Sequence, residues 1–162
     1  MWQDKGFIEN ARIDVSAAIS QLEALIVSVR ARYEKLDEDA LLKPPAPGKW
    51  SRQQVLGHLV DSALNNLKRF TEAQVLERPY TIIGYRQDEL VAVNHYQDMP
   101  LAQLLDLWQS LNRQIVFVVG FIPADALQYA VTPQYDQTGT QTLAWLICDY
   151  VAHLQHHLRN IE

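Results

Sequence analysis

Apolar residues recur at helical spacing in four long segments of this chain, and prolines and glycines separate the segments from one another. In the first, from about Ile13 to Leu36, the apolar positions are Val15, Ala18, Ile19, Leu22, Leu25, Ile26 and Val29. This period of 3.6 residues predicts an amphipathic helix with one buried face. The stretch KPPAPGK then breaks the chain, because proline removes a backbone donor and disfavours helical backbone in the residue before it.

The second and third segments have recognisable starts and ends. Ser51, with Gln54 three residues later, resembles a capping box, and it predicts a helix that runs to about Leu76. Asp98 and Pro100 mark the start of a third helix, which we expect to end at Gly120. Between these two helices, ERPYTIIGY is expected to be a partly extended connection and RQDELVAVNHY a short helix.

The last segment completes the predicted architecture. IPADAL is expected to form one helical turn and TPQYDQTGT a loop, after which Thr140 caps a final helix that reaches Ile161. Four amphipathic helices predict an all-α fold, a four-helix bundle with short connecting helices. We expect residues 1–162 to form one such domain, because a chain of 162 residues is long enough for one proper core.

Composition excludes several classes of function. Fourteen basic residues against 19 acidic ones give a formal charge of −5, and no basic stripe is present, which argues against a nucleic-acid partner. The longest apolar run, IVFVV, is too short to span a membrane, and the charged N-terminal stretch MWQDKGFIENAR lacks the apolar core of a signal peptide. A single cysteine excludes an internal disulfide and suits a reducing compartment. We therefore expect a cytoplasmic protein.

Three of the five histidines lie within five consecutive positions of the expected final helix. At about 100° per residue, with Leu154 at the centre of the apolar face, His157 lies about 60° and His153 about 100° away on the same flank. His156 points about 160° away, toward solvent. The rings of His153 and His157 project from successive turns, where both can bind one metal ion. Such a pair also packs beside a core without binding metal, so spacing alone leaves both interpretations open.

A fourth histidine, His58, lies at the edge of the apolar face predicted for the second helix, about 100° from Leu59. Two helices that each carry histidine beside the apolar face can direct three imidazoles into one pocket. Three histidine ligands with an open fourth position are typical of catalytic rather than structural metal sites. Asp61 lies further toward the polar side and could contact a ligand, although solvation is the simpler expectation for a single carboxylate.

The segments that carry these histidines resemble the DinB/YfiT-like superfamily of candidate metal-dependent enzymes. The stretch KWSRQQVLGHLVDSALNNLKRF is followed near the end of the chain by AHLQHHLRNI, and the middle section GYRQDELVAVNHYQDMPLAQLLDLWQSLNR also has the character of the family. Members are four-helix bundles with one histidine on the second helix and a His-x-x-x-His pair on the last. The resemblance implies His58, His153 and His157 as metal ligands. Relatives often have histidine or glutamine where this chain has Asn160, which puts a further polar contact there in doubt.

The resemblance also implies an activity and an assembly. Characterised relatives include transferases of low-molecular-weight thiols and a thiol-dependent maleylpyruvate isomerase, and such proteins usually receive the label hydrolase. A divalent ion, zinc or nickel, held by three neutral imidazoles would acidify a water molecule or a thiol in its open position. These properties predict a thiol S-transferase or a hydrolase that acts on a small-molecule substrate as a homodimer. The alternative is a non-catalytic metal-binding or interaction module with a structural metal.

No catalytic residue is assigned beyond the three metal ligands. The candidates for lining the pocket or contacting the ligands are Asp61, Tyr150, His156 and Asn160. His95 is expected at the surface or in a loop, with a pocket-lining position as the lesser alternative. Cys148 is expected to be a small buried side chain, because nothing near it in the sequence would activate the thiol.

Overall fold

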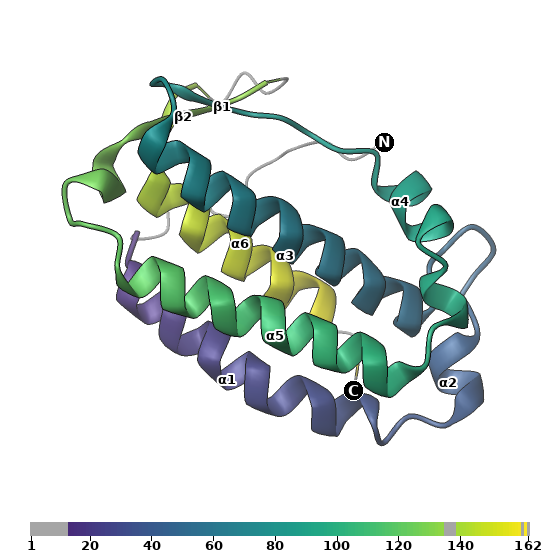
Figure 1. The fold of residues 1–162 in the computed structure, drawn as a ribbon. Helices are drawn as coiled ribbons and strands as arrows, with labels where there is room; N and C mark the ends of the chain where they lie inside the picture. The colour runs from purple at the N-terminus through teal and green to yellow at the C-terminus, as the bar shows by residue number, and fades with distance from the viewer. Residues whose placement is uncertain (1–12, 135–138, 160, 162) are drawn as a thin grey trace.

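The computed structural model describes residues 13–134, 139–159 and 161. Four long helices dominate this part of the chain (Figure 1): α1 (Val15–Tyr33), α3 (Arg52–Val75), α5 (Leu101–Gly120) and α6 (Leu143–Leu158). The all-α prediction of a four-helix bundle with short connecting helices is confirmed. Within the described residues, no helix combines the length and the apolar character that crossing a membrane would require.

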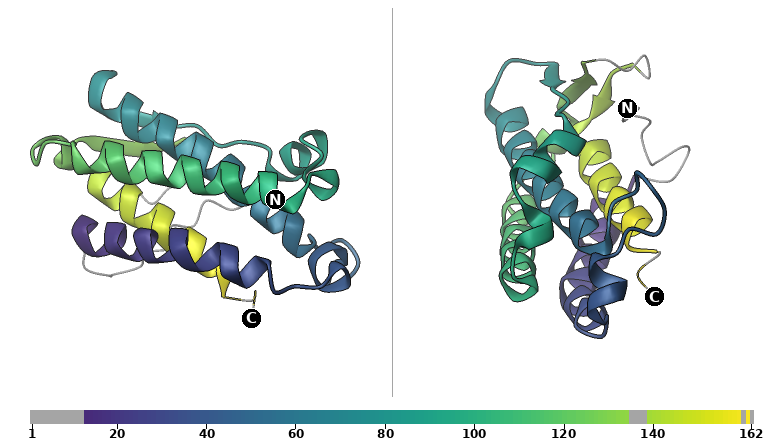
Figure 2. Two further views of the ribbon diagram at one scale, coloured as in Figure 1. Left: turned by 60° about the horizontal axis from the view of Figure 1, so that its bottom comes forward. Right: turned by 90° about the vertical axis from the view of Figure 1, so that its right-hand side faces the viewer.

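The helices run in an order that requires one long connection. Helices α1 and α6 run in one direction and α3 and α5 in the other, as Figures 1 and 2 show. Each of α1 and α3 packs against both α5 and α6. Because α3 and α5 are parallel, residues 76–100 must return along the whole bundle between them, and this connection is visible above α3 in Figure 1.

Shorter helices complete the connections. Helix α2 (Glu38–Leu42) precedes α3, and α4 (Gln87–Val93) lies in the long return, followed by a 3-10 turn (Tyr96–Asp98). A second 3-10 turn (Ala126–Gln128) occupies the predicted helical turn in IPADAL. The short helix predicted in RQDELVAVNHY is therefore present as α4.

Side-chain caps define where the helices begin. The predicted capping box is present: the Ser51 hydroxyl accepts a hydrogen bond from the Gln54 amide, and the Gln54 side chain accepts one from the Ser51 amide. The prediction that Thr140 caps the last helix is wrong. The cap is Thr142, whose hydroxyl accepts from the Trp145 amide, because the residues just before it are extended in a strand.

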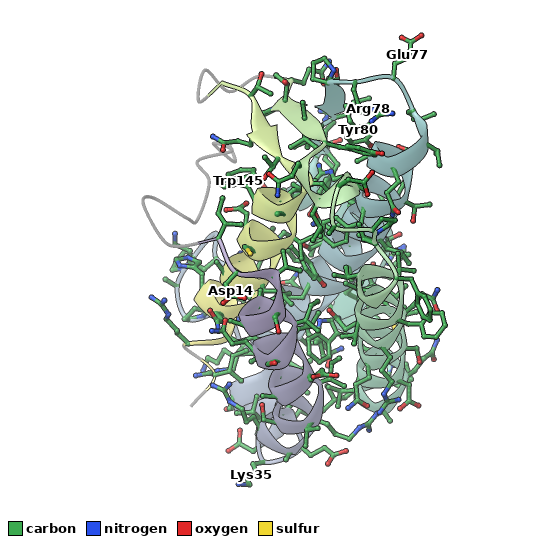
Figure 3. All side chains as sticks on the ribbon, turned by 90° about the vertical axis from the view of Figure 1, so that its left-hand side faces the viewer. Asp14, Lys35, Glu77, Arg78, Tyr80 and Trp145 are labelled. Atoms are coloured by element: carbon green, nitrogen blue, oxygen red, sulfur yellow. The ribbon has the colours of Figure 1, made fainter. Side chains whose placement is uncertain are left out.

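A small sheet covers one end of the bundle and leaves its centre helical. Strand β1 (Tyr80–Ile82) pairs in parallel with β2 (Ala130–Pro133), which pairs antiparallel with β3 (Gln141–Thr142). Thus the stretch TPQYDQTGT, expected to be a loop, begins in β2. Figure 3 shows Tyr80 and Trp145 together at this end and Lys35 at the opposite end. The histidines of interest lie toward the Lys35 end, since α3 begins and α6 finishes there.

Gly57 allows the segment after α4 to pack directly on α3. A Cβ atom at this position would lie 2.2 Å from Cγ of Tyr96, a ring that is itself buried. The same segment is held by Gln53, whose side-chain amide donates to the carbonyl oxygens of Tyr96, Gln97 and Met99. Close backbone approach and buried hydrogen bonds therefore lock this segment against the first turns of α3.

Replacing Gly57 by alanine is expected to lower the free energy of unfolding by about 1–3 kcal/mol, because the added methyl group must displace a buried ring. The measurement is chemical denaturation followed by circular dichroism. Gly120→Ala is the control, since a Cβ at Gly120 meets nothing within 4 Å, and no loss is expected there. Equal stabilities of the two variants would contradict the close contact between Gly57 and Tyr96.

Candidate metal centre

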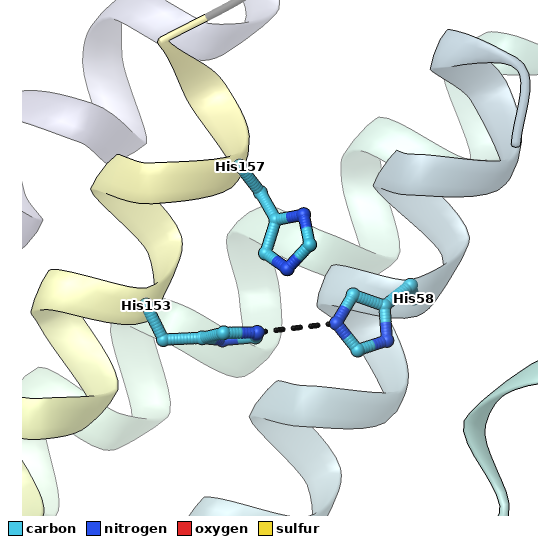
Figure 4. A group of neighbouring side chains, drawn as sticks. All are labelled: His58, His153 and His157. Carbon is cyan, nitrogen blue, oxygen red and sulfur yellow. Dashed lines mark hydrogen bonds between the residues drawn. The ribbon is translucent and has the colours of Figure 1, made fainter. Parts of the chain in front are cut away.

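Three imidazoles meet at the contact between α3 and α6. His58 projects from α3, and His153 and His157 project from successive turns of α6, so that the three rings face one another (Figure 4). One nitrogen of each ring lies within 4.8 Å of the corresponding nitrogens of the other two. Nε2 of His58 and Nε2 of His153 lie 3.2 Å apart. We refer to these residues as the histidine triad.

The spacing of one pair in the triad matches that of two ligands on a metal ion. Two nitrogens at about 2.0–2.1 Å from a tetrahedral ion are about 3.3 Å apart, close to the 3.2 Å between His58 and His153. The same 3.2 Å is within hydrogen-bond distance, with the N–H of one neutral imidazole donating to the ring nitrogen of the other. The donors are all imidazole nitrogens, a set that suits zinc, nickel, copper and iron.

Burial keeps the triad neutral, which is the form that binds metals. His58 is fully buried, and desolvation, followed by the proximity of His157, lowers its pKa to about 3. Burial followed by the charge of His156 lowers the pKa of His157 to about 4. For His153, burial and then the neighbouring histidines hold the pKa well below the usual value. At neutral pH no proton therefore competes with a metal for these lone pairs.

Ser62 orients one of the three rings. Its hydroxyl oxygen lies 3.3 Å from Nδ1 of His153, on the side of the ring away from the triad's shared space. A hydrogen bond at Nδ1 fixes the ring's orientation and leaves Nε2 to face His58. Nδ1 of His58, by contrast, is buried without a hydrogen-bond partner. Ser62 follows His58 by one helical turn on α3, so its position on the same face was deducible from the sequence.

Trp50 closes one side of the triad. Its ring lies against that of His58, with centroids 4.9 Å apart, and this contact helps to explain why His58 is fully buried rather than at a cleft border. Next to Trp50 a pocket of about 690 Å³ opens, and His156 and His157 line it. The triad therefore borders solvent-accessible space through the half-buried His157, whereas His58 and His153 are enclosed.

Asp61 is not solvated, contrary to the simpler expectation. It is 3% exposed, and Oδ1 accepts hydrogen bonds from the Tyr96 hydroxyl at 2.7 Å and from the Asn94 side-chain amide at 3.1 Å. The segment after α4 covers it, a long-range contact that helical periodicity does not reveal. Burial raises the pKa of Asp61, and the two hydrogen bonds oppose that shift. Because His58 Nδ1 has no partner, Asp61 makes no hydrogen bond to it.

The other candidate pocket residues have different positions. Tyr150 is buried in the bundle, where its hydroxyl donates to Oδ1 of Asn112 at 2.6 Å. His156 is exposed, with its ring edge-on to that of His157 at a centroid distance of 5.4 Å, so it borders the triad without joining it. Asn160 lies outside the described residues. His95 is exposed in a turn 3.8 Å from Asp98, away from the triad.

Cys148 is buried, as expected, and burial raises the pKa of its thiol. A protonated thiol in the interior is a poor nucleophile. The structure thus gives Cys148 the properties of a packing residue.

Comparison with known proteins places these features in a family. The model of the DinB superfamily matches residues 21–161. The chain belongs to the DinB superfamily. Relatives described as candidate metal-dependent hydrolases occur in Halalkalibacterium halodurans, at 27% identity over 92% of this chain and 85% of the relative. Others occur in Bacillus cereus and Bacillus thuringiensis, each at 28% identity over 88% of this chain and 80% of the relative.

A solved structure shows the same fold. YfiT from Bacillus subtilis, described as a candidate metal-dependent hydrolase with an unusual four-helix bundle topology, superposes with a TM-score of 0.82. The match covers 99% of this chain and 89% of YfiT, at 21% sequence identity. The fold of this chain, with its parallel α3 and α5, is therefore shared with a solved structure.

Metal retention in two variants tests the triad of this DinB-superfamily chain. His58→Ala is expected to lose most of the bound divalent metal, because it removes one of three converging ligands. The described residues around it offer no replacement ligand. His156→Ala, one residue from His157 but exposed, is expected to keep it nearly unchanged. Elemental analysis after metal loading and gel filtration is the measurement. Equal metal content in the two variants would refute the assignment of ligands.

Proposed function

We propose that this chain binds one divalent transition metal, zinc or nickel, through His58, His153 and His157. Three observations support the proposal: the convergence of the ring nitrogens, the neutral state that burial imposes, and the hydrogen bond that orients His153. Membership of a superfamily whose relatives are described as candidate metal-dependent hydrolases supports it as well.

We further propose that the metal is catalytic. Among the described residues, the group that could hold a metal consists of the three histidines alone, with no carboxylate or cysteine beside them. Three protein ligands are typical of catalytic sites, whereas structural sites commonly use four. The pocket beside His157 would give a small molecule a path to the site. A structural metal that joins α3 to α6 is the alternative.

The reaction we favour is the transfer of a low-molecular-weight thiol to an electrophilic carbon. The S–H bond breaks and its proton passes to solvent, a C–S bond forms, and the leaving group departs with its electron pair. The bound metal would supply the acidification that makes the thiol a thiolate at neutral pH. His58, His153 and His157 hold the ion, Ser62 orients His153, and Trp50 excludes water from the far side of His58.

Among the described residues, no carboxylate joins the histidine triad, and this supports the preference for thiol transfer. In the hydrolysis of an ester or amide, the attacking water loses a proton and the leaving group gains one. Enzymes usually place an acidic or basic side chain to carry out these transfers. Asp61 is the nearest candidate along α3, but its described hydrogen bonds go to Tyr96 and Asn94. A thiol needs only to lose one proton before it attacks. Hydrolysis is the second candidate, favoured by the descriptions of the relatives.

Metal-loaded protein is expected to consume a small thiol in the presence of a chromogenic electrophile, and His153→Ala is expected to abolish the metal-dependent rate. The assay runs a panel of thiols and electrophiles beside simple ester and amide substrates. His95→Ala is the control, because it removes an exposed imidazole that belongs neither to the triad nor to the lining of the pocket. Thiol-independent turnover of esters or amides would favour hydrolase over transferase.

Failure across the panel would count against catalysis only together with a structural result. If no substrate is turned over and a protein side chain fills the metal's fourth position in a structure of the loaded protein, the structural-metal alternative replaces the enzyme. An exchangeable water in that position, detected by magnetic relaxation of a paramagnetic substitute ion, would keep the site open to a substrate.

We propose, finally, that the protein is a cytoplasmic homodimer. Apolar side chains remain exposed on two neighbouring helices, with Val27 on α1 78% exposed and Phe117 on α5 63% exposed. Closed two-fold pairing is the commonest assembly that covers such residues. Sedimentation equilibrium at micromolar concentration is expected to give about twice the chain mass, whereas a mass near 18.6 kDa would contradict the proposal.

A further inference from the structure

The pocket beside the triad is lined by positive charges, whereas the net charge of the chain is negative. It lies between the segment before α3 and the last turn of α6, and its lining includes Lys49, Trp50, Arg52, Val55, His157 and Ile161. Its fixed charges, Lys49 and Arg52, are both positive, whereas the chain as a whole has a formal charge of −5. The pocket is thus a local cationic site on an acidic protein.

In the part of the chain that the structure describes, neither cation has a carboxylate partner. The described ion pairs involve neither Lys49 nor Arg52. The Arg52 guanidinium donates from Nη1 to the carbonyl oxygen of Ala40 at 2.9 Å, and its Nε is buried with no hydrogen-bond partner. An ionised side chain placed at a cavity without a carboxylate retains its capacity to bind an anion.

Lys49 and Arg52 line the same pocket as a histidine of the triad, so their charge can act on a molecule bound at the triad. His157 lines the same pocket, and Trp50 links it to His58 through their ring contact. A molecule in the pocket would therefore touch apolar side chains and two cations at one end and a triad imidazole at the other. Apolar walls with few polar groups of defined position are typical of small-molecule sites.

We propose that this pocket binds the anionic group, a carboxylate or a phosphate, of a small substrate whose reacting atom lies at the triad. Lys49 and Arg52 hold the anion, and the walls formed by Trp50, Val55 and Ile161 cover its carbon skeleton. The proposal rests on the proposed function for the reacting end, and it names the substrate class: small anionic molecules. Its binding step can be tested without turnover.

Isothermal titration of metal-loaded protein measures that step. The probes are succinate and methyl phosphate as the two kinds of anion, with dimethyl succinate as the uncharged analogue. We expect at least one of the anions to bind more tightly than dimethyl succinate, and its affinity to fall as ionic strength rises, since salt screens an exposed ion contact. The preference between succinate and methyl phosphate identifies the anion.

Lys49→Glu is the main variant, because Lys49 is exposed and its side chain makes no described hydrogen bond, so the fold does not depend on it. It is expected to weaken anion binding about tenfold. Lys68→Glu changes the net charge equally, but Lys68 lies outside the lining of the pocket, and it is expected to leave the affinity nearly unchanged. Arg52→Gln is expected to weaken binding as well, and Arg52→Lys to recover part of the loss.

Elemental analysis of each variant separates this proposal from the metal proposal, because Lys49→Glu and Lys68→Glu should both keep the metal. The inference is overturned if dimethyl succinate binds as tightly as both anions, or if Lys49→Glu and Lys68→Glu have the same affinity. In that case metal-dependent thiol turnover would still support the proposed function. Selective anion binding without any turnover would support the anion-binding proposal and would contradict only the proposed enzymatic function.

Discussion

Where α3 begins and α6 ends, the structure depends on the burial of the three imidazoles of the histidine triad at the contact between these helices. Polar rings removed from water cost stability unless their nitrogens find partners, and here His58 and His153 face each other at 3.2 Å while Ser62 approaches Nδ1 of His153. Burial also makes the rings neutral, as their lowered pKa values show. The same desolvation that makes the triad costly to bury thus prepares it for a metal ion.

Hydrogen bonds between side chains and the backbone at the start of α3 position His58 for this role. The Ser51–Gln54 capping box sets the first turn of the helix, and Gln53 binds three carbonyl groups of the segment after α4. Gly57 lets that segment approach closely enough to cover the helix. A ligand on a helix held from both sides keeps its geometry better than one on a loop. Packing around the first two turns of α3 is therefore part of the site.

Local patterns explain what the sequence could predict. The Ser51–Gln54 spacing identified the start of α3, and helical geometry separated His153 and His157 from His156, because both are properties of one helix. Contacts between distant segments escaped this reasoning. Pairing of β3 with β2 moved the last cap from Thr140 to Thr142, and the segment after α4 buried Asp61. Periodicity has no information about which distant strand or turn will cover a residue.

The two sides of the triad differ in a way that sets the direction of access. On the side of His153, hydrogen bonds continue into the bundle. The side-chain amide of Asn66 donates to the backbone carbonyl oxygen of Ser62, and the guanidinium of Arg69 donates to the carbonyl oxygen of Ile83. On the side of His157 the pocket is open, and the ion pairs found among the described residues include neither Lys49 nor Arg52. A path through the bundle would break interior hydrogen bonds, and leaving their donors and acceptors unpaired costs free energy. A ligand therefore has its open path to the triad past His157, where, on our proposal, the positive charge of Lys49 and Arg52 would select an anion.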